Sequence, residues 1–136
     1  MILDKMQMFS EDQDLAQTAS TYYSTNVIDL GDAAKGEGEP IEVLIQVTEA
    51  FTSTGAATLV IVLQTDSVEA MSSPTAIFTS ATLALATIAV VGYKATIRVL
   101  PNDCEQYLRI AYTIGTATTT AGKISAGLVR NIPTNP

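Results

Sequence analysis

The stretch of sequence that decides the fold class is IEVLIQVTEA, Ile41 to Ala50. Every second position in it is apolar, through Ile41, Val43, Ile45 and Val47. Successive side chains of a strand point to opposite faces, so this period of two indicates a strand with one face buried. The segment therefore predicts a half-buried strand.

Three more segments extend this β pattern along the chain. Residues 93–99 and 107–114 alternate in the same way, whereas Leu59 to Leu63, LVIVL, is apolar on both faces. Such a strand is either central with both sides covered or has an outer face against a partner. An oligomer would explain the second alternative, with Val60 and Val62 as contact residues.

Weaker strand patterns cover Asn26–Leu30, Ile77–Leu83 and Lys123–Arg130. Residues 81–91 fit a strand or a helical turn, and we favour the strand. Gly, Pro, Asn and Asp mark turns or loops at 31–40, 52–56, 69–74, 101–103 and 115–122. Short strands at this spacing predict an all-β fold, an antiparallel β-sandwich or jelly roll of about eight strands.

Residues 1–20 lack the alternation and are predicted to form an N-terminal arm, followed by one domain over 21–136. The arm begins with an apolar cluster, Ile2, Leu3, Met6, Met8 and Phe9. Ser10 to Gln13 has the spacing of a capping box and predicts a short helical turn from Glu11, the one helix expected. The apolar segment either contacts a partner or packs back on its own sandwich.

Composition limits the chemistry that the chain can perform. It has 136 residues with no His, one Cys, 14 acidic and 7 basic residues, and a net charge of −7. Imidazole catalysis, multi-cysteine metal sites and intrachain disulfides are excluded, and so we expect no enzyme, no cofactor and no metal site. The negative charge disfavours nucleic acid and anionic membranes, and neither a membrane-spanning stretch nor a signal peptide is apparent. The expected partner is protein.

The acidity is concentrated in the first part of the chain. Residues 1–49 hold 10 of the 14 acids and 2 of the 7 bases, which leaves 4 acids and 5 bases in residues 50–136. This distribution predicts one acidic edge and a nearly neutral body.

Two segments that contain glycines are candidates for binding loops. GTATTTAGK, Gly115 to Lys123, fails as a phosphate-binding loop because its glycines are too far apart and Ile124 follows the lysine. The acidic segment 31–40 is expected to be a solvated connection, with calcium binding or protein contact as the alternatives left open.

Charged residues of the strands have similarly ordinary interpretations. Glu42, Glu49 and Asp66 are candidates for glycoside hydrolysis, but solvation of the sheet is favoured because aromatic residues for sugar stacking are few. The bases Lys94, Arg98 and Arg109 would lie on one hairpin turning at 101–103, as a basic stripe or as cross-strand partners of acids such as Glu42. Cys104 has no base to activate it.

Two long stretches carry a resemblance to a known family. They are MILDKMQMFSEDQDLAQTASTYYSTNVIDLG, residues 1–31, and EQYLRIAYTIGTATTTAGKISAGLVRN, residues 105–131, with its YLR-x-x-Y and TAGK-x-x-AGLV strings. These resemble the jelly-roll capsid cement, or decoration, proteins of tailed bacteriophages, the family of the Bordetella phage cement protein. The middle of the chain fits the same layout more loosely.

The resemblance implies a structural virion protein on the outer surface of the capsid, where it would stabilise contacts between major capsid protein subunits. It also implies a homo-oligomer, a dimer in preference to a trimer, and it supplies no catalytic residues. The candidate partner-binding residues are Met1, Ile2, Leu3, Met6, Met8, Phe9, Val60 and Val62. The alternative function is a β-sandwich carbohydrate-binding or tail-associated adhesion module, which would need exposed aromatic residues on one face.

Overall fold

Ten strands and one short helix form in the part of the chain that the computed structural model describes, residues 8–29, 41–99 and 106–129. The strands are β1 (Met8–Asp14), β2 (Thr21–Tyr23), β3 (Ile28–Asp29), β4 (Ile41–Ser53), β5 (Thr58–Asp66), β6 (Thr75–Thr79), β7 (Leu83–Ala84), β8 (Lys94–Val99), β9 (Tyr107–Gly115) and β10 (Thr119–Val129). The helix, α1 (Leu85–Ile88), lies between β7 and β8. No helix among these residues is long and apolar enough to span a membrane.

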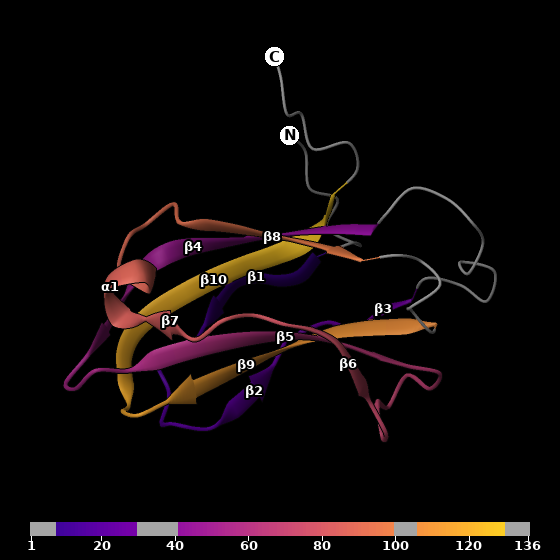
Figure 1. The fold of residues 1–136 in the computed structure, drawn as a ribbon, viewed down its shortest axis with the longest axis horizontal. Coiled ribbons are helices and arrows are strands. Elements are labelled where there is room, and N and C mark those ends of the chain that lie inside the picture. The colour runs from indigo at the N-terminus through magenta and orange to yellow at the C-terminus, as the bar shows by residue number, and fades with distance from the viewer. Residues whose placement is uncertain (1–7, 30–40, 100–105, 130–136) are drawn as a thin grey trace, which may run out of the picture.

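The strands form two antiparallel sheets stacked as two layers (Figure 1). The first, called the β4 sheet, has the order β1-β10-β4-β8. The second, called the β5 sheet, has the order β2-β9-β5-β6, with β3 also on β9 and β7 also on β5. The chain changes sheet at most connections, so that neighbouring strands come from distant parts of the sequence. This is the topology of a jelly roll, and it confirms the predicted fold class.

Two jelly-roll strands are each broken in two, which explains why ten strands form where about eight are expected. A serine lies at each break and bonds to the adjacent central strand. Ser24 Oγ accepts the backbone N–H of Ile110 at 3.1 Å between β2 and β3. Ser80 Oγ accepts the backbone N–H of Ile61 at 2.9 Å between β6 and β7. Each hydroxyl thus satisfies a buried donor at the point where the strand leaves the ladder.

The core lies between the two sheets and is built from alternate residues of the central strands. Its largest fully buried side chains include Phe9, Phe51, Leu59, Ile61, Leu63, Ile97, Leu108, Ile110, Tyr112 and Ile114. The alternation predicted for residues 41–50, 93–99 and 107–114 is therefore confirmed. Strand β5 is central in its sheet, with Leu59, Ile61 and Leu63 in the core and the residues between them half-buried on the outer face.

The helical turn predicted from Glu11 is wrong, because residues 8–14 form strand β1 at the edge of the β4 sheet. The Ser10 hydroxyl does donate to Gln13 Oε1, at 2.6 Å, but the bond spans a bulge in the pairing of β1 with β10. Asp12 has a φ of 47° there. The bulge destroys the period of two, which is why the sequence does not resemble a strand. From Met8 onward, the expected arm is part of the sandwich.

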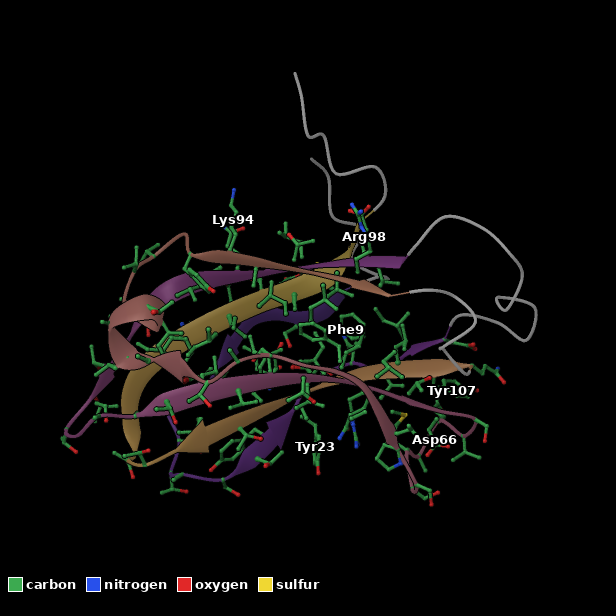
Figure 2. All side chains as sticks on the ribbon, viewed as in Figure 1. Phe9, Tyr23, Asp66, Lys94, Arg98 and Tyr107 are labelled. Carbon is green, nitrogen blue, oxygen red and sulfur yellow. The ribbon has the colours of Figure 1, made fainter. Side chains whose placement is uncertain are left out.

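The predicted hairpin between residues 93–99 and 107–114 is also wrong. β8 pairs with β4, whereas β9 pairs with β2, β3 and β5 in the other sheet. Alternation reveals which face of a strand is buried but not which strand lies beside it. The basic stripe consequently does not form. Lys94 and Arg98 extend from the β4 sheet (Figure 2), whereas Arg109 lies on β9 in the β5 sheet. Residues 31–40, the 101–103 turn and Cys104 lie outside the described residues.

The strand favoured for residues 81–91 is wrong for most of that segment. Only Leu83 and Ala84 pair, with β5, and the chain then turns into α1. The helical-turn alternative applies to residues 85–88, where Leu85 and Ile88 share one face and pack on the core. The helix of the described residues therefore lies between β7 and β8, and not before the first strand as predicted.

Gly122 is required by close packing at the start of β10, which begins at Thr119 within the segment expected to be a loop. Its φ is 146°, and a Cβ built on it would lie 2.5 Å from Cδ2 of the buried Phe51 ring. The ring therefore occupies the space that any side chain would need. This explains a glycine in the TAGK string without a phosphate site.

Candidate interaction surface

The structure separates the contact residues predicted from the sequence. Met1, Ile2, Leu3 and Met6 lie outside the described residues. Met8 and Phe9 are buried in the chain's own sandwich, 6% and 0% exposed, which is the second of the two alternatives for this segment. Val60 and Val62 are half-buried on the outer face of the β5 sheet. The structure therefore does not join the N-terminal residues and the two valines into one surface.

The outer face of the β5 sheet carries a mixture of apolar and polar side chains in rows across the strands. The rows are Thr21, Thr113 and Val60; Tyr23, Ala111, Val62 and Thr79; and Arg109, Gln64 and Ala76. Figure 1 shows no other described element below this sheet. Tyr23 is 48% exposed and extends away from the sandwich, as Figure 2 shows.

Arg109 is fixed on this outer face by two neighbouring strands. Its Nε and Nη2 both donate to Gln64 Oε1, at 3.1 Å and 2.8 Å. Its guanidinium carbon lies 3.8 Å from the centroid of the Tyr23 ring, a cation–π contact. The three side chains come from β9, β5 and β2, and we call them the Arg109 cluster. The sequence pattern predicts a surface position for Arg109 but gives no signal for Tyr23 or Gln64.

A family model described as Bbp16 matches residues 9–128, which run from β1 to β10 and include the whole Arg109 cluster. The chain belongs to the Bbp16 family. Bbp16 is a Bordetella phage protein, so the chain is a member of a phage protein family, as the resemblance implies. A search of curated proteins finds no match.

The three candidate acids for glycoside hydrolysis have structural contacts in this Bbp16-family chain. Glu42 Oε1 pairs with Arg98 Nη2 at 3.2 Å on the β4 sheet, the cross-strand pair anticipated from the sequence. Glu49 Oε1 accepts the backbone N–H of Gly122 at 3.2 Å. Glu42 and Glu49 lie on β4 and Asp66 on β5, so the three candidates are divided between the two sheets.

Asp66 closes the loop that follows β5. Its carboxylate accepts the backbone N–H groups of Ser73 at 2.9 Å, Ser67 at 2.6 Å and Val68 at 3.4 Å. These bonds, led by the one from Ser73, hold the pKa of Asp66 below its usual value of 3.8. A general acid of a glycoside hydrolase needs the opposite shift.

The charges of the Bbp16-family chain are distributed unevenly over its described surface. Glu11, Asp12 and Asp14 are exposed on β1, at one edge of the β4 sheet, which agrees with the predicted acidic edge. Arg109 is the one basic residue in the described strands of the β5 sheet. No described carboxylate lies within salt-bridge distance of it. No cluster of three metal-ligating side chains occurs among the described residues.

Proposed function

We propose that the chain is a capsid cement protein, which binds the outside of a phage head and stabilises contacts between major capsid protein subunits. The observation that carries the proposal is the match to the Bbp16 family over residues 9–128, a segment that includes every strand of the jelly roll at least in part. A β-sandwich that presents a broad outer sheet face is suited to a structural role.

The charge of the chain favours the outer surface of the head over its interior. The chain carries a net charge of −7, and a filled head is lined by the phosphates of packaged DNA. An acidic protein is repelled by that interior, whereas the outer surface imposes no such penalty.

Modest contacts are sufficient for a protein that binds in many copies. A small homo-oligomer, which we propose is a dimer, engages neighbouring capsid subunits together, so that the first contact raises the effective concentration at the second. Each contact then needs only a limited buried area. Sedimentation equilibrium tests the oligomer, and a monomer at all micromolar concentrations contradicts it.

The direct test is co-sedimentation of the purified chain with isolated phage heads that lack it, followed by heating. We expect the chain to bind the heads and to raise the temperature at which they rupture. A chain that fails to bind, or binds without raising that temperature, is not a cement protein. Specific binding in a glycan array would instead support the carbohydrate-binding alternative, although one side of the Tyr23 ring already contacts Arg109.

A truncation tests the N-terminal arm without damaging the sandwich. Deleting residues 1–7 leaves β1 intact, since that strand begins at Met8. If the arm contacts the capsid, the truncated chain keeps its unfolding temperature but decorates heads more weakly. Equal decoration assigns the capsid contact to the rest of the chain.

A further inference from the structure

We infer that the outer face of the β5 sheet docks on a protein surface that presents a carboxylate, and that Arg109 is the residue that receives it. The inference rests on the proposed function, because it identifies the partner surface as that of the major capsid protein. It adds the chemistry of the contact, the residue that recognises it and the face of the sandwich that is turned toward the capsid.

The side chain of Arg109 is preorganised for such a contact in the free protein. Gln64 Oε1 receives two of its N–H donors, and the Tyr23 ring supports one side of the guanidinium plane. An exposed arginine otherwise loses side-chain entropy when it binds, so prior restraint increases the affinity of the bound state. Gln64 is neutral and therefore positions the group without cancelling its charge.

Part of the guanidinium group remains available for a partner. No described residue accepts a hydrogen bond from its Nη1, and no described carboxylate forms an ion pair with it. The planar fork of arginine matches a carboxylate through two parallel hydrogen bonds. Elsewhere in the described chain, Arg98 already has such a partner in Glu42. With respect to the described residues, Arg109 is thus positioned but not neutralised.

The side chains around Arg109 favour a protein over a nucleic acid. Arg109 is the one base in the described strands of this sheet, whereas binding along a phosphate backbone uses several cations. Val62 lies in the adjoining row and Val60 in the row beyond it, and both are half-buried and offer apolar contact. An arginine and an exposed tyrosine beside half-buried aliphatic residues form the composition found at the centre of protein interfaces. One carboxylate among apolar side chains is the complementary surface.

Five of the eight described acids belong to the β4 sheet and lie away from this contact. Glu11, Asp12 and Asp14 lie on β1, in the β4 sheet. On the β5 sheet, Asp29 and Asp66 lie on either side of Tyr107 in the row next to Arg109, and the Asp66 carboxylate already accepts three backbone N–H groups. Arg109 is the one positive charge in the described strands of this sheet, and it is the group on this face that can receive a carboxylate.

The test measures the affinity of purified variants for heads that lack the chain, by co-sedimentation at two salt concentrations. We expect Arg109→Gln to weaken binding at least about tenfold and to reduce its sensitivity to salt. Arg109→Lys keeps the positive charge but not the planar guanidinium group, so its affinity should lie between those of the wild type and Arg109→Gln. Lys94→Gln removes the same charge from the β4 sheet and should bind within about twofold of the wild type. Thermal unfolding of each variant verifies that it is folded.

A double-mutant cycle tests Tyr23 as a positioning residue. Tyr23→Ala should weaken binding when Arg109 is present and add little when Arg109 is already Gln. Independent, additive losses from the two changes would contradict a role that acts through the guanidinium group.

The outcomes separate this inference from the proposed function. If the wild type binds heads and Arg109→Gln binds equally well, the inference is wrong and the cement function stands. If the wild type does not bind heads, the cement function fails and the inference falls with it. If Arg109→Gln converts an oligomer to a monomer in sedimentation equilibrium without changing head binding, the face belongs to a second copy and the capsid contact is wrong.

Discussion

Phe9→Ala distinguishes a residue of the core from a residue of a docking arm. Phe9 is the second residue of β1, has no exposed surface and belongs to the main hydrophobic cluster. Truncating a fully buried Phe to Ala typically costs about 3–5 kcal/mol, because apolar contact is lost and a cavity remains. This is a large part of the ~5–15 kcal/mol that stabilises an ordinary domain.

The expected shift is large enough to measure simply. For a chain of this length, 1 kcal/mol corresponds to about 3 °C, so the midpoint of thermal unfolding should fall by roughly 10–15 °C. Urea titration followed by circular dichroism gives the free energy of unfolding directly. Val91→Ala is the control, because Val91 is 61% exposed and its truncation should change stability by less than about 0.5 kcal/mol.

One result would refute the burial argument. If Phe9→Ala unfolds within about 0.5 kcal/mol of the wild type and yet binds heads more weakly, then Phe9 contributes to docking and not to the core. The same logic explains why a deletion that extends through Phe9 is a poor test of the arm, since it removes core packing together with any contact.

Three further predictions concern the fold. Gly122→Ala should destabilise the chain by about 2–4 kcal/mol, because the new methyl group overlaps Phe51 and the backbone is strained at positive φ. Gly92→Ala has open space around it, so it should lose only the part of the stability that comes from backbone strain. Calorimetry measures both losses. Because its pKa is lower in the folded chain than the unfolded value of 3.8, the Asp66 carboxylate stabilises the fold above about pH 4 and loses that effect as pH falls further. Urea unfolding at pH 7, 4 and 3 should therefore show a smaller acid-induced loss for Asp66→Asn, and equal losses would contradict this role. Gln13→Ala should cost about 1–3 kcal/mol, because Gln13 joins β1 to residues Tyr23 and Thr25, while Gln17→Ala, whose described hydrogen bonds are all from the backbone, should have little effect in the same titration.

The parts of the fold that could be predicted are those in which one face of a strand is buried without interruption. β4, β8 and β9 alternate cleanly, so their sequences predict both the strand and its inner face. β1 could not be predicted, because a bulge between Ser10 and Gln13 shifts the alternation of its apolar residues. The false hairpin arose because β8 and β9, although consecutive, lie in different sheets.

On the candidate surface, residues of a single strand could be predicted, whereas a cluster formed by several strands could not. Val60 and Val62 could be found because a central strand with apolar residues on both faces is unusual in a sheet exposed on one side. Tyr23, Gln64 and Arg109 could not be found as a cluster, since they lie on strands far apart in the sequence. Only the pairing of β9 with both β2 and β5 brings them together.

The two edge strands of the β4 sheet, β1 and β8, affect the tendency of the chain to aggregate when many copies are present. An unpaired strand edge can recruit the edge of another molecule and begin aggregation. β1 has two register shifts, a residue at positive φ and three exposed acids, and β8 has exposed Lys94 and Arg98. Irregular backbone and charge make both edges poor templates for further strands. The β4 sheet is therefore protected against pairing edge to edge with a second molecule when many copies are present.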